Sequence, residues 1–241
     1  CGYGGDKGIF GFGYIGGGTN VGMTNLVSNA GVVASDVTAV GIARRALVAC
    51  EYGEDKGIFG FGDTGSVTAV TNLVSNSGVV ASDVTGVGTV RYYLAACSYG
   101  DDKGIFGYGY SGGNLSMTNL VSNSGVVATD TTGVGTAREG PAACEYGVDK
   151  SIFGYGNTGS LVSMSNLVSN AGVVATDVTG VGTAREYLAA CEYGGDKGIF
   201  GFGWTTESVS MTNLVSNAGV VATDVTGVGT AREYIAACSF N

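Results

Sequence analysis

The sequence of 241 residues predicts an all-β fold built from five copies of one unit, and three observations carry this prediction. Residues 144–190 and 191–237 are identical at 38 of 47 positions. No segment shows a sustained helical period with helix caps. Cysteines recur every 47 residues, at Cys50, Cys97, Cys144, Cys191 and Cys238. A repeat of this length is typical of a stacked or ring-closed repeat architecture.

Each repeat reads as four short strands, which are described here for the last copy. Lys197–Gly203 has aromatic and β-branched residues between glycines. Met211–Asn217 is followed by the hairpin signal Ala218-Gly219 and then by Val220–Asp224, and Arg232–Phe240 forms the fourth run. Four strands per repeat are the unit of a propeller blade, so five copies predict a five-bladed β-propeller with four antiparallel strands in each blade.

The repeat fills the whole chain, which predicts a single domain. Its copies are residues 1–49, 50–96, 97–143, 144–190 and 191–237, with closing residues 238–241. In each blade the run from the arginine to the cysteine is expected to be innermost, and the chain begins beyond the place where this run would start. We therefore expect the C-terminal strand to supply the innermost strand of the first blade and to close the ring, because closure removes exposed strand edges.

Ala231-Arg232 before an apolar strand, the Lys197-Gly-Ile-Phe-Gly-Phe-Gly strand and a small-residue loop resemble kelch repeats. The resemblance covers every repeat. Gly-Phe-Gly or Gly-Tyr-Gly stands where kelch repeats have a double glycine, and the later Tyr and Trp of that pattern are absent. The resemblance implies a propeller in which arginines at the blade mouths hold acidic peptides.

The composition argues against several classes of function. A net charge of −9 disfavours nucleic-acid binding, which relies on Lys and Arg at phosphates. The absence of His removes the commonest general base and metal ligand, so we expect no metal and no cofactor. No apolar run is long enough to span a membrane. Cysteines in five equivalent places cannot all pair with one another, so we expect small buried side chains, with Cys1 and Cys238 competing for one place.

The loop after the Ile-Phe strand is the most variable part of the repeat. Aromatic and amide side chains at its first position suit stacking against sugars or peptide side chains, and binding residues often lie on loops of a rigid scaffold. The alternative is sequence drift at tolerant loop tips. The candidate residues are Tyr14, Asp63, Tyr110, Asn157 and Trp204.

The same face is expected to carry one arginine from each repeat. A ring of guanidinium groups near a channel mouth can bind an acidic partner through paired hydrogen bonds. The alternative is a structural arginine that bonds loop carbonyls or a neighbouring Asp, and its presence in all five copies favours that role. These arginines are Arg44, Arg91, Arg138, Arg185 and Arg232.

The sequence therefore predicts a non-catalytic, monomeric recognition module that binds a carbohydrate or a peptide through the variable loops. The alternative is a purely structural repeat of a surface or fibre protein. A glycosidase-like enzyme is disfavoured because the axial acids Glu51, Glu145 and Glu192 are near copies of one another, and equal environments do not separate carboxyl pKa values. The sequence leaves the compartment open, although the acidity suits an exposed or extracellular module.

Overall fold

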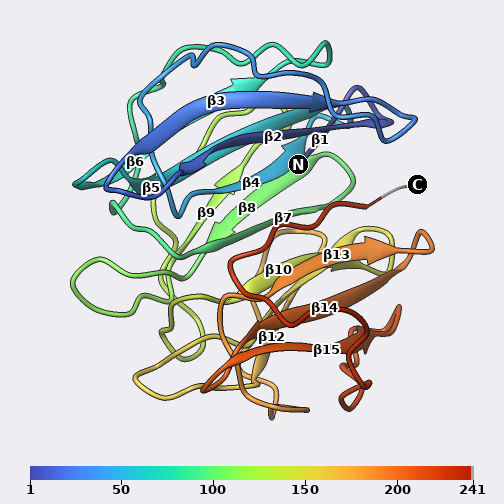
Figure 1. The fold of residues 1–241 in the computed structure, drawn as a ribbon. Helices are drawn as coiled ribbons and strands as arrows, with labels where there is room; N and C mark the ends of the chain where they lie inside the picture. The colour runs from blue at the N-terminus through green and yellow to red at the C-terminus, as the bar shows by residue number, and fades with distance from the viewer. Residues whose placement is uncertain (240–241) are drawn as a thin grey trace.

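The computed structural model describes residues 1–239, and this part of the chain is all-β. Five antiparallel sheets follow one another along the chain, each with three strands in sequence order (Figure 1). The strands are β1 (Gly2–Tyr3), β2 (Lys7–Tyr14) and β3 (Asn20–Val27); β4 (Val48–Tyr52), β5 (Lys56–Asp63) and β6 (Val67–Val74); β7 (Ala95–Tyr99), β8 (Lys103–Gly107) and β9 (Thr118–Val121); β10 (Ala142–Tyr146), β11 (Lys150–Gly154) and β12 (Ser165–Val168); and β13 (Ala189–Tyr193), β14 (Lys197–Trp204) and β15 (Ser208–Val215). The predicted all-β tandem repeat is thus confirmed.

The first strand of each sheet lies beside the first strand of the next sheet. β1 contacts β4, and β4, β7, β10 and β13 contact one another in that order. The residues at these contacts are small, with Ala95, Cys97 and Ala142 each less than one-tenth exposed. Larger side chains of the middle strands fill the space between sheets, as Phe106 and Phe153 do at zero exposure. The core is therefore a series of equivalent layers between successive sheets.

The middle strands β2, β5 and β14 carry a register shift at a Gly-aromatic-Gly sequence. In β5 the register shifts between Gly60 and Gly62, and Phe61 between them has a φ of 64°. A positive φ is uncommon for an aromatic residue and is typical of a bulge that redirects a side chain. The bulge places the Phe61 ring edge-on to Phe106 of the next sheet at 5.2 Å. The local irregularity thereby connects two sheets.

The outer strand expected in each unit, the third of its four runs along the chain, is reduced to two isolated bridges. In the last copy, where Val220–Asp224 was expected, Val221 bridges Val215 and Val225 bridges Thr212. Between these bridges the fully buried Asn213 donates from Nδ2 to the carbonyl of Ala222 at 3.0 Å. A side-chain amide thus takes the place of a ladder hydrogen bond, which explains why the segment follows the sheet without forming a continuous strand.

The C-terminal run differs from the expectation for Arg232–Phe240. Residues 232–239 form no strand, and residues 240 and 241 lie outside the described part of the chain. β2 is paired instead with β1 from the N-terminus. The physical reason lies at Cys1, whose carbonyl accepts a hydrogen bond from the amide of Ile9 at 2.9 Å and so occupies the place expected for Cys238. In Figure 1 the C-terminal run (red) passes between the first and last sheets.

Candidate functional site

The variable loops pair with a second variable position that follows the repeated arginine. Arg45 and Asp63 exchange backbone hydrogen bonds of 3.0 and 2.9 Å, and an ion pair of 3.0 Å joins their side chains. Equivalent backbone bridges recur at Tyr92–Tyr110, Glu139–Asn157 and Glu186–Trp204. Each bridge brings the first residue of a variable loop and the residue after the repeated arginine to the same edge of a sheet. We call these four pairs the variable face.

Two tyrosines form the pair on the third sheet. The Tyr92 and Tyr110 rings meet edge-on with their centroids 5.7 Å apart, and both side chains are partly exposed. Tyr92 also contacts Tyr93 at 4.6 Å. Partly exposed aromatic rings provide flat apolar surfaces together with hydroxyl groups, the combination that stacks against sugar rings or peptide side chains.

The pair on the fifth sheet combines the single tryptophan with a buried carboxylate. Glu186 is 7% exposed, and burial raises the pKa of its carboxyl group. Asn157 of the neighbouring sheet donates from Nδ2 to Glu186 Oε1 at 3.2 Å. Trp204 bridges Glu186 through the backbone and stays partly exposed. An indole, an amide and a carboxylate therefore lie together at one edge.

Tyr14 on the first sheet lies apart from the bridged pairs. Its ring is 47% exposed, and the guanidinium carbon of Arg45 lies 5.0 Å from the ring centroid. Its hydroxyl accepts a hydrogen bond from the amide of Gly18 at 2.8 Å. The position that would pair with it by the rule of the other four sheets is Glu233. The structure thus brings four of the five loop candidates into one type of pair and leaves Tyr14 beside Arg45.

The repeated arginines lie inside the protein. Arg44, Arg91, Arg138 and Arg185 are fully buried, and burial lowers the pKa of Arg44 and Arg91 to about 10. Each donates from Nη2 to a fully buried asparagine of its sheet, as Arg138 does to Asn166 at 2.7 Å. Arg232 is exposed, although it still lies 4.2 Å from the centre of the Phe202 ring. The four buried guanidinium groups therefore have the structural role that the sequence left as an alternative.

Tyrosines also gather where the inner strands begin. The amide of Tyr93 donates to Ala46, Gly140 to Tyr93, Tyr187 to Gly140 and Tyr234 to Tyr187, with lengths of 2.8 to 3.2 Å. These five residues occupy one position of five successive copies. The Tyr187 and Tyr234 rings stack at 4.2 Å, and Tyr93 contacts both rings. A chain of backbone hydrogen bonds thus carries an aromatic cluster near the variable face.

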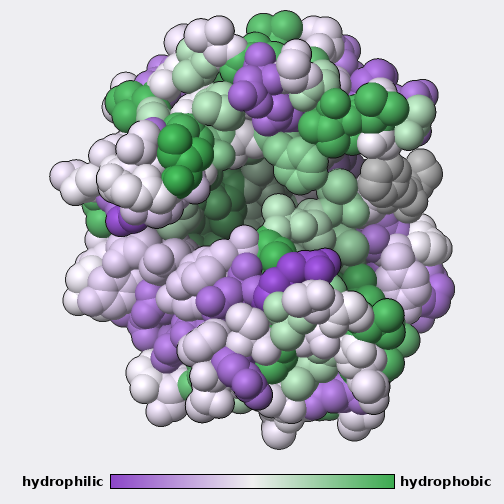
Figure 2. Space-filling view, viewed as in Figure 1, coloured by the Kyte–Doolittle hydropathy of each residue, from purple (hydrophilic) through white to green (hydrophobic). Residues whose placement is uncertain are grey.

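A cavity of about 790 Å³ extends from this cluster toward β2. Its walls include Phe10, Phe12, Leu94 and Leu188, with Tyr187 among the polar groups at its edge. Figure 2 shows a hollow in the molecular surface with hydrophobic residues deep inside it. A mostly apolar hollow with a few polar groups is the usual form of a binding site, and its volume falls in the range of such sites.

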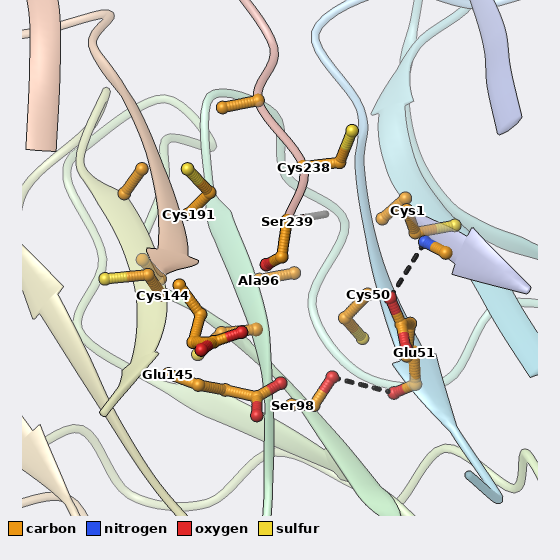
Figure 3. Close-up of a pocket in the computed structure, with 17 residues that line it drawn as sticks. Cys1, Cys50, Glu51, Ala96, Ser98, Cys144, Glu145, Cys191, Cys238 and Ser239 are labelled. Atoms are coloured by element: carbon orange, nitrogen blue, oxygen red, sulfur yellow. Dashed lines mark hydrogen bonds between the residues drawn. The ribbon is translucent and has the colours of Figure 1, made fainter. Parts of the chain in front are cut away.

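The other end of the inner strands carries acidic and small polar residues (Figure 3). Ser98 donates to the carbonyl of Glu51 at 3.4 Å, and the amide of Gly2 donates to Glu51 Oε1 at 2.9 Å. Burial, together with the negative charges of Glu51 and Glu192, raises the pKa of Glu145 to about 7. Among residues 1–239 no group of three or more acidic or cysteine side chains is placed to hold a metal ion.

Two comparisons with known proteins found no match to this chain. No family model matches the chain, and no curated protein matches it. The described residues contain no helix capable of crossing a membrane. The sequence interpretation did not use the bridging partners Arg45, Tyr92, Glu139 and Glu186 as candidates. The signal was present, since the residue directly after the constant arginine is Arg45 in the first copy, Tyr92 in the second and Glu in the other three.

Proposed function

We propose that the five sheets are kelch-like blades of one ring, a β-propeller whose outer fourth strands are the bridged segments. The support is the repetition of one interface between successive sheets. Phe59 packs against Gly11 of the preceding sheet, and Phe106 packs against Gly60 in the same way. A constant rotation between equivalent neighbours leads to a ring when the number of copies matches the rotation.

We infer further that the protein is a non-catalytic recognition module and that its ligand binds on the variable face. One observation carries this inference. Sequence differences between repeats gather in residue pairs along one edge of the sheets, whereas the arginine-aromatic contacts behind them are constant. Variation on one face of a constant scaffold is typical of binding loops.

The chemistry of the pairs favours a carbohydrate. Trp204 and Tyr110 present partly exposed rings, on which the apolar face of a sugar can stack. Glu186 and Asn157 lie beside Trp204 and offer a carboxylate and an amide for sugar hydroxyl groups. A peptide with aromatic or amide side chains is the second ligand class that such residues accept.

A glycan array with the full chain tests this proposal. Wild-type protein is expected to retain at least one glycan, and Trp204→Ala is expected to reduce the signal by about tenfold or more, the value of a lost stacking contact. Val148→Ala is the matched control, because Val148 is 65% exposed on the turn between β10 and β11 in the fourth sheet, whereas Trp204 ends β14 in the fifth sheet. Absence of any bound glycan, or equal binding by Trp204→Ala, would overturn the carbohydrate proposal.

A structural repeat module is the second candidate, and a specific surface favours it. One valine of each outer segment is 64 to 65% exposed. These residues are Val32, Val79, Val126, Val173 and Val220. Identical apolar residues on the rim of every sheet suit contacts with repeated neighbours in an assembly. Self-association that Val→Ser substitution at these five positions abolishes, together with an empty glycan array, would support this candidate.

A further inference from the structure

Four equivalent interfaces connect the five sheets, and each contains the same contacts. A Cβ built on Gly11, Gly60, Gly107 or Gly154 would meet the ring of a phenylalanine from the following sheet at 2.7 to 2.9 Å. The amides of Gly4, Gly53, Gly100 and Gly147 donate to carbonyls of the following sheet at 2.7 to 2.8 Å. These contacts define the interface, and the same contacts would be expected between the last sheet and the first sheet if the ring is closed.

The last and the first sheet each carry the residues of this interface, but those residues are not in contact with one another. Phe10 is 48% exposed, whereas Phe59, Phe106, Phe153 and Phe200 are at most 4% exposed. Tyr193 is 37% exposed, whereas the equivalent tyrosines Tyr3, Tyr52, Tyr99 and Tyr146 are at most 5% exposed. A Cβ on Gly31, Gly194 or Gly229 would meet no described atom within 4 Å. The interface residues of the first and last sheets are therefore left unpacked at a gap between the two sheets.

The inner strand of the first sheet is incomplete beside this gap. In the second sheet, β4 covers β5 with the pairs Val48–Gly60, Ala49–Phe59 and Cys50–Ile58. In the first sheet, Cys1 bonds to Ile9, and β1 pairs only with Gly8 and Lys7. Phe10 and Gly11 of β2 line the 790 Å³ cavity instead, opposite Ile235, Ala236 and Ala237.

We propose that Ile235–Ala237 docks on β2 end to end with Cys1–Tyr3, so that the two chain ends form one two-piece inner strand. The register follows from the other sheets, with Ala236 opposite Gly11 and Ala237 opposite Phe10. Cys1 keeps the cysteine position, because its Sγ already lies against Gly57 as Cys50 Sγ lies against Gly104. Small residues at 236 and 237 suit this position, since alanines occupy it in the third, fourth and fifth sheets.

Docking also completes the variable face. The bridges Arg45–Asp63 and Glu186–Trp204 place the residue after each arginine beside the first residue of a variable loop. By the same rule the docked strand places Glu233 beside Tyr14 as a fifth pair. It also brings the carbonyl of Tyr234 to the amide of Ala46, which adds the last link to the chain of hydrogen bonds near the cluster. That this pair serves as a fifth ligand position rests on the proposed function, whereas the docking itself does not.

Hydrogen exchange of the full chain, followed by mass spectrometry, tests the docking without a ligand. Gly8–Tyr14 is expected to exchange as slowly as Gly57–Asp63, the same strand of the second sheet, within about threefold. Ala236→Pro is expected to accelerate exchange of Gly8–Tyr14 by about tenfold or more and to leave Gly57–Asp63 unchanged, because proline cannot donate to Gly11. Ala237→Pro is the matched control, since residue 237 lies opposite Phe10 in a pair without ladder hydrogen bonds.

The opposite results overturn the proposal. Faster exchange of Gly8–Tyr14 in the wild type, unaffected by Ala236→Pro, would show that the strand does not dock. Slow exchange confined to a dimer on gel filtration would identify a second copy as the occupant. If the Ala236→Pro variant does not fold, the losses of stability caused by Phe10→Ala and Phe106→Ala are compared instead. Equal losses support docking, and a much smaller loss for Phe10→Ala excludes it. An empty glycan array with normal protection would reject the ligand position alone.

Discussion

The guanidinium carbon of Arg138 lies 3.9 Å from the centroid of the Tyr108 ring, which belongs to the preceding sheet. The same ring meets Phe153 edge-on at 5.2 Å. Arg138 and Phe153 both belong to the fourth sheet with its preceding loop, so Tyr108 is held between a cation and an aromatic ring of its neighbour. The arrangement recurs in four interfaces. This contact explains why the arginine is constant, because every interface needs it.

Replacement of Arg138 by methionine is expected to lower the free energy of unfolding by about 2–4 kcal/mol, because buried Asn166 Oδ1 loses its donor and Tyr108 loses its cation. Arg45→Met is the control for the loss of one positive charge. Arg45 is about half exposed and forms a surface ion pair with Asp63, so its loss should cost less than about 1 kcal/mol. Urea denaturation measures both values, and equal effects would contradict the structural role of Arg138.

Much of the fold could be predicted because the repeat itself carries the information. Glycine-framed apolar runs every 47 residues correctly indicated the middle strands and the strands that follow them, such as β14 and β15. The outer segments were overestimated, because a buried asparagine replaces ladder hydrogen bonds there. The segment keeps backbone hydrogen bonds, such as that from the amide of Ala222 to the carbonyl of Leu214, so its pattern of hydrophobic residues resembles that of a continuous strand. The C-terminal run is a separate case, because Cys1 already bonds to Ile9 at the position where the sequence placed Cys238.

Replacement of Gly107, the last residue of β8, by a residue with a side chain is expected to destabilise the protein. A Cβ on Gly107 would lie 2.7 Å from Cζ of Phe153, whose ring is fully buried. Gly107→Ala should therefore destabilise the protein by about 1–3 kcal/mol, the usual cost of overpacking. Gly113→Ala is the control, because a Cβ on Gly113 meets no described atom within 4 Å, and its effect should stay within about 0.5 kcal/mol. Thermal unfolding of both variants gives the comparison, and a wild-type melting temperature for Gly107→Ala would argue against this packing.

The sequence predicted the loop residues of the candidate site but not the residues that pair with them. The variable loops stood out because Tyr14, Asp63, Tyr110, Asn157 and Trp204 differ where the rest of the repeat is constant. Their partners lie 18 residues earlier in the chain, as Glu186 lies before Trp204. Only the pairing of strands brings such residues together. The arginines were ambiguous because a constant residue fits both a symmetric site and a structural contact, and burial separates the two.

The cysteines are expected to differ in reactivity according to burial. All six are free thiols; Cys50, Cys97 and Cys144 are buried, and Cys238 is exposed. Burial raises the pKa of Cys97 to about 12, which leaves almost no reactive thiolate at pH 8. Brief treatment with iodoacetamide should therefore label Cys238 in the native protein and the three buried thiols only after unfolding. Peptide mass spectrometry reads out the labels, and rapid labelling of Cys97 in the native state would contradict its burial.

Glu145, a partly buried acid near the chain ends, is expected to make the stability of the protein depend on pH. The pKa of Glu145 is raised to about 7 in the folded protein, above its value of about 4.3 in an unfolded chain. The folded state therefore prefers the protonated carboxyl group, and the stability that it contributes is present below about pH 4.3 and is lost as pH rises through 7. Glu145→Gln cannot ionise, so its stability relative to the wild type should increase over this range by about 1–3 kcal/mol.

Urea midpoints at acidic, neutral and mildly basic pH measure this increase. Glu207→Gln is the matched control, because Glu207 is exposed in the loop between β14 and β15 and its replacement removes the same charge. Comparison with Glu207→Gln separates the effect of the Glu145 position from the loss of one carboxylate. A constant difference for Glu145→Gln would mean that Glu145 ionises without cost, and that water reaches the acidic end of the inner strands freely. A difference that grows with pH would show that the carboxylates there are held away from water.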